Sequence, residues 1–283
     1  MFTSFSLNIK GRLISWNRPA VMGILNVTPD SFYADSRAFE NESTDRQAAR
    51  LIEEGADMID IGGYSSRPGA DDVCPDEELR RLEQGIAAVR RLNADIPISV
   101  DTFRADVALK AVTQLGADII NDISGGTLDD KMIEVVASTH APYIMMHMRG
   151  TPADMQQHTD YTDVTCEVVD WLSRQLAQFS LAGAGDIIID PGFGFSKTTD
   201  QNFEMLASLP LFNSLGRPIL VGVSRKSMIY KSLDITPAES LNGTTVINTL
   251  ALERGASILR VHDVAAARQA VKLVGLTNNQ KYC

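Results

Sequence analysis

The chain has 283 residues, of which 44% are hydrophobic, so it can build one large core and is close in length to a (β/α)8 barrel. Asp and Glu number 36 against 26 Lys and Arg, and the resulting net charge of -10 argues against a general affinity for nucleic acid or anionic membranes. The three cysteines lack metal-type spacing, and no run approaches the ~18 apolar residues of a membrane span. Because a signal-peptide pattern is also missing at the start, we expect a reduced, cytoplasmic protein.

The order of elements along the chain predicts a barrel of the α/β class. Residues 1–18 alternate in polarity around Lys10 and Gly11, which predicts a β-hairpin that plugs the barrel floor. Eight runs that are apolar at nearly every position then predict strands covered on both faces. They are residues 20–27, 57–61, 96–100, 118–120, 142–146, 186–189, 218–223 and 257–261. Helical spacing between them, as at 75–92, 163–181 and 237–253, favours a (β/α)8 TIM barrel over residues 19–276 of a single domain, with a tail at 277–283.

Two kinds of connecting segment are expected. Gly55, Gly116, Gly183 and Gly255 each stand shortly before an apolar run, where glycine ends a helix in the left-handed conformation. These four turns predict the structural end of the barrel. In contrast, residues 28–43 and 62–76 are long, polar and rich in Gly, Pro, Ser and Asp, so we expect them to be mobile lids.

Polar residues follow the apolar runs, at positions that converge on one pocket in barrels of this type. Asp101, Asn121 and Asp190 offer acid and amide groups suited to a flat heterocycle with several donors, such as a pterin-like edge. Each one alone could instead cap a turn or helix. Asp101 and Asp190 could also bind a divalent metal, although the neighbouring amides and the lack of a His and Glu cluster weaken that alternative.

Cationic residues form a second candidate group. Arg67, Lys226, Arg260 and His262 suit a phosphate or pyrophosphate, which barrels often bind near the loops after the last two strands. For Arg225 a structural salt bridge is an equal alternative. Asn26 could add one oxygen ligand to a Mg²⁺ ion that bridges phosphates. Dinucleotide, Walker and hydrolase-elbow motifs are missing from the sequence, so those functions are not supported.

Several segments together carry a family resemblance. Residues 22–32 (MGILNVTPDSF) and 60–63 with 66–70 look like the two signature segments of dihydropteroate synthase. Further matches lie at 99–102, 121–122, 146–148, 190–195, 224–227 and 260–263. The sequence therefore resembles the pterin-binding barrel family of dihydropteroate synthases over about the whole chain. Members of that family are targets of sulfonamides, and the resemblance also implies a homodimer.

The resemblance implies a role for each matching position. The residues implied for the pterin are Asp101, Asn121, Met146, Asp190 and Lys226. Those implied for the p-aminobenzoate side are Ser66, Arg67, Pro68, Phe195 and Ser227. Arg260 and His262 would hold the pyrophosphate, and Asn26 would contact its Mg²⁺ cofactor. Asp101, Lys226 and Arg67 are the implied catalytic residues. The chain departs from the family pattern at Tyr64 and Ser65, where Glu or Gln then Ser is common, and at Ser196, where Gly is frequent.

The implied reaction joins 6-hydroxymethyl-7,8-dihydropterin pyrophosphate to p-aminobenzoate, giving 7,8-dihydropteroate and pyrophosphate in folate biosynthesis. We expect catalysis by charge and position, because a neutral arylamine is already nucleophilic and needs no strong base. Asp101 would help to stabilise the developing cation. Two alternatives stay open: a methyltetrahydrofolate methyltransferase, which needs a corrinoid partner and no pyrophosphate site, and a catalytically silent pterin-binding barrel.

Overall fold

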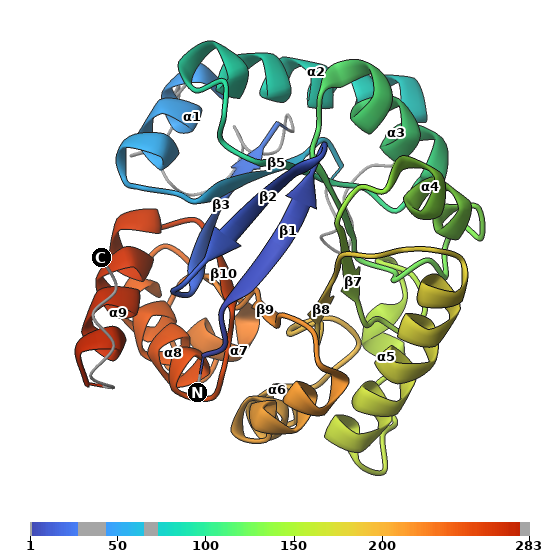
Figure 1. Cartoon of the computed structure of the whole chain (residues 1–283). Coiled ribbons are helices and arrows are strands. Elements are labelled where there is room, and N and C mark those ends of the chain that lie inside the picture. The colour runs from blue at the N-terminus through green and yellow to red at the C-terminus, as the bar shows by residue number, and fades with distance from the viewer. Residues whose placement is uncertain (1, 28–43, 65–72, 278–283) are drawn as a thin grey trace.

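The computed structural model describes residues 2–27, 44–64 and 73–277, and it shows a ring of strands enclosed by helices (Figure 1). The hairpin strands are β1 (Phe5–Ile9) and β2 (Arg12–Trp16). The barrel strands are β3 (Ala20–Asn26), β4 (Met58–Gly62), β5 (Ile98–Asp101), β6 (Ile119–Asp122), β7 (Tyr143–Met146), β8 (Ile187–Asp190), β9 (Leu220–Val221) and β10 (Ile258–Val261).

The α-helices are α1 (Thr44–Glu53), α2 (Pro75–Leu92), α3 (Ala105–Lys110), α4 (Met132–Thr139), α5 (Val164–Leu181), α6 (Thr199–Ala207), α7 (Ser227–Tyr230), α8 (Leu241–Glu253) and α9 (Val264–Thr277). A π-helical turn, Ala111–Leu115, follows α3, and 3₁₀ turns span Met155–Gln157 and Leu209–Leu215. Among the described helices none combines the length and the apolar character needed to cross a membrane.

The predicted (β/α)8 barrel is confirmed. Eight parallel strands lie in the order β8-β7-β6-β5-β4-β3-β10-β9, and a bridge between Ile189 and Ile219 joins the two ends. The predicted run at 218–223 forms a ladder only at Leu220–Val221, so β9 is the shortest of the eight barrel strands. Helix α2 has the predicted bounds and begins at Pro75, a residue suited to the first helical turn. Asp163 caps α5 by accepting a hydrogen bond from the Cys166 N–H at 2.8 Å.

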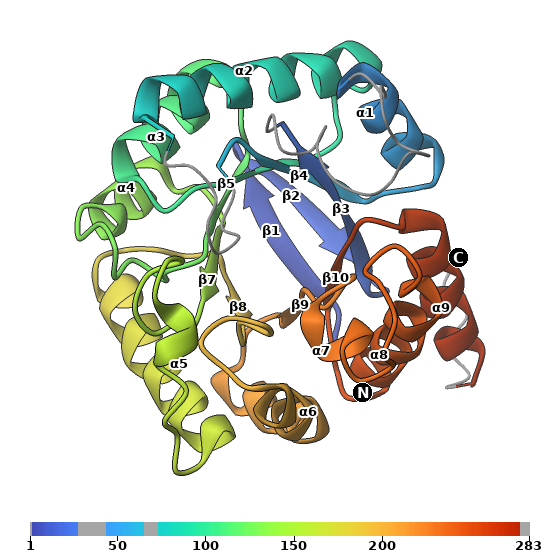
Figure 2. The ribbon, with the colours of Figure 1, turned by 180° about the vertical axis from the view of Figure 1, so that it is seen from behind.

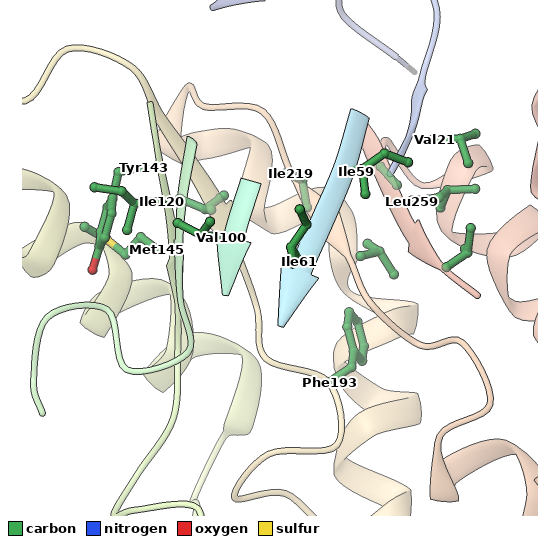
Figure 3. Close-up of a cluster of buried hydrophobic side chains, with 14 of the residues drawn as sticks. Val21, Ile59, Ile61, Val100, Ile120, Tyr143, Met145, Phe193, Ile219 and Leu259 are labelled. Carbon is green, nitrogen blue, oxygen red and sulfur yellow. The ribbon is translucent and has the colours of Figure 1, made fainter. Parts of the chain in front are cut away.

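Side chains alternate between the two faces of each barrel strand. One set points outward into the layer between strands and helices; Figure 3 shows Val21, Ile61, Val100 and Met145 from this cluster. The other set points inward. At the floor it is apolar, and its members are Ala20, Met22, Met58, Ile119, Ile144, Ile188, Leu220 and Ile258. Because the period is two, the polar residues two positions further along these strands also face the barrel interior.

The N-terminal hairpin closes the barrel floor, as predicted. Lys10 and Gly11 have φ angles of 51° and 83°, the left-handed pair that a tight two-residue hairpin turn requires. Phe5 and Trp16 lie opposite each other and stack with ring centroids 5.0 Å apart. Both belong to the same buried cluster as the inward-facing floor residues. Figure 1 shows the hairpin across the near end of the barrel, and Figure 2 shows the molecule from the opposite end.

The four glycine turns predicted at the structural end are confirmed as well. Gly55, Gly116, Gly183 and Gly255 have φ angles of 90°, 89°, 101° and 99°. Each precedes a barrel strand, and because the eight strands are parallel, they all start at the same end of the barrel. The hairpin covers this end. The other end of the barrel is formed by the residues with which the strands finish.

Truncation of Trp16 tests the hairpin as a structural plug. We expect Trp16→Ala to lower the free energy of unfolding by about 3 kcal/mol or more, because it removes a large buried side chain from the floor cluster. Urea denaturation measures this loss. Leu13→Ala in the same strand is the control, since Leu13 is 73% exposed and its loss should cost less than about 0.5 kcal/mol. Equal denaturation midpoints for the two variants would contradict the plug.

Candidate functional site

The pairing register gathers the predicted residues at one mouth of the barrel. Asn26 pairs with Gly62, Gly62 with Asp101, and Asp101 with Asn121, so residues from four neighbouring strands form one row. Met146 pairs with Asp190 on the next two strands. These are the carboxyl ends of the strands, where barrel enzymes bind their substrates. The predicted convergence of these side chains is therefore present.

Arg260 forms the centre of the polar interior. Its Nε lies 2.6 Å from Asp60 Oδ2, and its guanidinium also reaches Asp101 Oδ2 at 2.8 Å. The Asn121 side-chain amide donates to the same Asp60 oxygen at 3.0 Å. Asp60 is fully buried, and within the described part of the chain its Oδ1 has no hydrogen-bond partner. Asp60 lies in the matched segment 60–63, but no role was predicted for it, and its place in this network is known only from the structure.

These contacts alter the division of the site into an acidic group and a basic group. Arg260 was grouped with the basic residues, yet it lies between two carboxylates inside the barrel. Paired opposite charges offset part of the desolvation cost of each. The acid, amide and basic groups are therefore interleaved, and Arg260 neutralises charge that would otherwise repel an anionic substrate.

The environment of Asp101 favours its protonated form. Burial, aided by the nearby carboxylates of Asp60 and Glu78 and opposed by the charge of Arg260, raises the pKa of Asp101 to about 7. Burial also raises the pKa of Asp190, against the opposing charge of Lys226. A ligand that presents hydrogen-bond donors or positive charge to these two groups would favour their ionised form.

Lys226 lies beside Asp190 and faces the loop that follows β8. Its ammonium donates to the Phe193 carbonyl at 2.5 Å and lies 4.6 Å from the centre of the Phe195 ring. Burial lowers the pKa of Lys226 to about 8, while the charge of Asp190 partly restores it. Ser227, the next residue, begins α7. A charged lysine, a carboxylate and an aromatic face thus lie together on this side of the mouth.

The loops after β9 and β10 give His262 and Arg225 different surroundings. His262 Nδ1 lies 3.0 Å from Ser224 Oγ, close to the mouth. Arg225, in contrast, forms a two-pronged ion pair with Asp263 at 2.9 and 2.8 Å and donates to the carbonyls of Pro237 and Ala238. Arg225 therefore forms the structural salt bridge that the sequence offered as an alternative to phosphate binding.

Three of the predicted residues, Ser66, Arg67 and Pro68, lie outside the described residues, as do Ser65, the segment 28–43 and most of the segment 62–76. Tyr64 stands at the edge of the described chain. Its ring packs edge-on against Phe103 at 5.3 Å, and the Arg104 guanidinium lies 5.2 Å from its centre. The departure at Tyr64 therefore adds an aromatic contact to this side of the mouth.

An apolar group at the mouth was not predicted in full. Met146 and Phe195 were expected, and the structure clusters them with Ile123, Met148, Met155, Phe103 and Leu128. Met148 lies within the matched segment 146–148, which could have identified it. Phe103 and Met155 carry no such signal, because their approach depends on loop packing. The cluster provides an apolar wall for a flat ring.

Lys197 was also missed, although it directly follows the motif at 190–195. It is 3% exposed, and its ammonium lies 3.1 Å from His147 Nδ1, 3.1 Å from the Gly192 carbonyl and 3.0 Å from the Phe195 carbonyl. Burial lowers the pKa of Lys197 to about 7. Burial also lowers the pKa of His147 well below its ordinary value, and the charge of Lys197 adds to this.

The alternative of a metal held by Asp101 and Asp190 gains no support. Asp101 pairs with Arg260, and Asp190 Oδ1 accepts a hydrogen bond from the Gly192 N–H at 2.8 Å. Across residues 2–27, 44–64 and 73–277, no group of three or more His, Cys, Asp or Glu side chains is arranged to hold a metal ion. The acids of the mouth are arranged to accept hydrogen bonds.

Comparison with known proteins agrees with this geometry. Residues 22–262 match the model of the pterin binding enzyme family. The chain belongs to this family. A relative named dihydropteroate synthase, from Synechocystis sp., is 47% identical over 266 residues, covering 92% of this chain and 91% of that protein.

Solved structures of family members agree as well. The dihydropteroate synthase of Xanthomonas albilineans with 4-aminobenzoic acid matches with a TM-score of 0.87 and 39% identity, covering 98% of this chain and 99% of that one. The enzyme from the same organism in complex with 7,8-dihydropteroate matches with a TM-score of 0.84 and 36% identity, over 96% of this chain and 98% of that one.

The buried lysine of this pterin-binding barrel predicts a pH dependence of stability. The pKa of Lys197 is about 7 in the folded protein against 10.5 ordinarily, so between these values the unfolded chain binds more protons. The contribution of Lys197 to the free energy of unfolding should therefore rise with pH across this window. Urea denaturation of wild type and Lys197→Met from pH 7 to about 10 measures the difference. Parallel curves would show that Lys197 titrates normally.

Proposed function

We infer that this chain catalyses the dihydropteroate synthase reaction of folate biosynthesis. It transfers the pterinylmethyl group of 6-hydroxymethyl-7,8-dihydropterin pyrophosphate to p-aminobenzoate, giving 7,8-dihydropteroate and pyrophosphate. The observation that carries this conclusion is the meeting of Asp101, Asn121, Asp190 and Lys226 at one mouth of a family barrel. The nearly full-length match to dihydropteroate synthases supports it.

We propose that the pterin lies in the polar interior of the mouth. Asp101 and Asp190 offer carboxylate oxygens to the ring donors, and the Asn121 side chain offers amide groups. Met146, in the apolar cluster, packs against the flat face of the ring. An analogue without the ring donors would leave these buried acids unpaired, which explains how such a site selects a pterin.

The two other parts of the substrates are assigned to opposite sides of the mouth. His262 and Arg260 supply the positive side that receives pyrophosphate, together with Arg67 from the second lid. Phe195 and Ser227 line the p-aminobenzoate side, with Ser66 and Pro68 completing it. Support for this side comes from the cluster of Phe195 with Met146 and Met148, which suits an aromatic ring.

The chemistry follows from charge and position. The bond between the pterin methylene carbon and the pyrophosphate oxygen breaks, and the arylamine nitrogen forms a bond to that carbon and then loses a proton to solvent. Lys226 and Arg260 stabilise the negative charge that builds up on the leaving group. Asp101, once ionised by the bound pterin, stabilises positive charge on the ring system. Holding the amine close to the carbon supplies the rest of the acceleration.

Mg²⁺ is a proposed cofactor. Asn26 stands in the row at the mouth, and its Oδ1 approaches Gly62 so closely that a β-carbon there would lie 3.4 Å away. A single amide oxygen fits Mg²⁺, which keeps most of its waters and binds chiefly to substrate phosphates. When bound, the ion would neutralise charge on the pyrophosphate. Asn26 would fix the position of the ion at the mouth.

Two further proposals concern the oligomeric state and the cellular location of the enzyme. A homodimer is supported by exposed apolar side chains on adjacent helices: Val246 and Leu250 on α8, and Leu273 and Leu276 on α9. A cytoplasmic location is supported by Cys74 and Cys166, which are free and exposed, as in a reducing compartment.

Neither methyltransferase nor silent-barrel function explains the basic residues beside Asp190 as well as pyrophosphate release does.

Turnover is the direct test of the function. Purified protein with the pterin pyrophosphate, p-aminobenzoate and Mg²⁺ should release pyrophosphate, measured in a coupled assay. Lys226→Ala should lower kcat/KM by about 10²-fold or more, because it removes a charge that faces the reacting groups. Asp190→Ala should have a similar effect through loss of pterin binding.

Lys231→Ala is the matched control, since Lys231 is exposed five residues further on and its loss should leave turnover unchanged. Thermal unfolding should show that all three variants are folded. Absence of pyrophosphate release by the wild type at saturating substrates would refute the assignment.

Removal of the Asn26 amide tests the Mg²⁺ proposal apart from turnover. Asn26→Ala should weaken binding of Mg²⁺-pyrophosphate by about tenfold, the scale of one good polar contact. Titration calorimetry with inorganic pyrophosphate, with and without Mg²⁺, measures this. Asn8→Ala, at the hairpin end of the barrel, is the control. An equal loss of affinity in the absence of Mg²⁺ would assign Asn26 to the phosphate instead of the ion.

A further inference from the structure

The loop after β8, residues 191–197, is packed tightly onto the end of β7. Gly192 has a φ of 74°, and a β-carbon on it would lie 2.0 Å from the His147 carbonyl oxygen, so no side chain fits there. The His147 N–H donates to the Asp190 carbonyl at 3.1 Å, which continues the strand pairing to this point. The start of the loop is therefore fixed against β7 by backbone contacts.

Lys197 holds the end of the same loop. A charged lysine has three donors and no acceptor, and the Lys197 ammonium lies within hydrogen-bond distance of three groups. Two are the carbonyls of Gly192 and Phe195 within the loop, and the third is the neutral ring of His147. The buried Lys197 ammonium thus contacts both ends of the loop and His147, which follows β7.

Ser196 adds a second attachment. It is fully buried and has a φ of 45°, a left-handed conformation that favours glycine. Its hydroxyl accepts a hydrogen bond from the Arg149 N–H at 3.0 Å and lies 3.4 Å from the Tyr161 hydroxyl. These contacts offset the strain of the left-handed backbone. Ser196 therefore ties the loop to the residues that follow β7.

The loop carries Phe195 between two lysines. On one side Lys197 binds the Phe195 carbonyl, and on the other Lys226 lies under the Phe195 ring. Gly194 also packs closely on Lys226, since a β-carbon there would lie 3.0 Å from the lysine Cδ. The attachments at Ser196 and Lys197 hold the backbone that carries the Phe195 ring, and the ring itself packs on Lys226 and the apolar cluster.

We propose that Ser196 and Lys197 are positioning residues that set the affinity for p-aminobenzoate by holding Phe195 in place, without touching either substrate. The inference rests on the proposed function, in which Phe195 lines the arylamine side. A loop that is already ordered loses less conformational freedom when the ligand binds, so affinity is higher. Loss of an attachment lowers affinity for the ligand that contacts Phe195 and spares the pterin, which lies deeper among Asp101, Asn121 and Asp190.

Three variants test this with steady-state kinetics in both substrates. Ser196→Ala keeps the β-carbon and removes the hydroxyl, so it should raise the KM for p-aminobenzoate roughly fivefold, the scale of one hydrogen bond. The KM for the pterin pyrophosphate and kcat should change by less than about twofold. Ser196→Gly should raise the same KM although it relieves the backbone strain, and it should be more stable than Ser196→Ala. Lys197→Met should have the largest effect.

Ser138→Ala is the control, because Ser138 makes a side-chain hydrogen bond to the Val135 carbonyl of α4, away from the mouth. Stability loss in Ser196→Ala with an unchanged KM for p-aminobenzoate would overturn the proposal, as would equal increases in both KM values. The Ser196 variants decide the matter if Lys197→Met does not fold. A wild type without turnover refutes the proposed function and this inference with it, whereas normal wild-type kinetics with unaffected variants refute this inference alone.

Discussion

The two-residue alternation of side chains along the barrel strands is the constraint on which the site depends. In a closed ring of parallel strands, alternate residues face the interior, and the chain uses them in layers. The lowest layer is apolar and is sealed by the hairpin through Phe5, Leu7 and Trp16. Above it the inward residues become polar, with Asp60, Asn121, Asp190 and Arg260 two positions beyond apolar floor residues. One structural rule therefore builds both a dry, rigid base and a polar binding site.

Placing so many charges in the interior is costly unless they are paired. Arg260 meets this requirement by contacting both Asp60 and Asp101, while Asn121 adds a neutral donor to the same network. Burial raises the pKa of Asp101 and lowers that of Lys226, and the charges of these neighbouring groups also depend on one another. Such mutual dependence suits a site where charge moves from a carbon centre to a departing anion.

The loops at the mouth complete the binding site, and close backbone packing fixes their position. Gly192 allows the loop after β8 to approach the His147 carbonyl more closely than any side chain would permit, and Gly194 packs closely on the Lys226 side chain. Lys197 and Ser196 then attach the loop to the residues after β7. Because these contacts join segments about fifty residues apart, the position of Phe195 depends on the packing of two neighbouring strand ends.

How much of this could be read from the sequence differs from one feature to another. Apolar runs, glycine turns and strand-end polar residues are local patterns, so they predicted the eight strands, the hairpin and the convergence of Asn26, Asp101, Asn121 and Asp190. The family segments assigned roles to these residues for the same reason, since each segment is continuous in the chain. What local pattern could not decide was which charge pairs with which. Arg260 pairs with Asp60, two hundred residues away, and with Asp101. Arg225 pairs with Asp263 and not with a group at the mouth, and Lys197 is buried beside two carbonyls and His147. Those pairings arise only when strands close into a ring and loops pack across it, because electrostatic contacts depend on distance in space and not on distance along the chain.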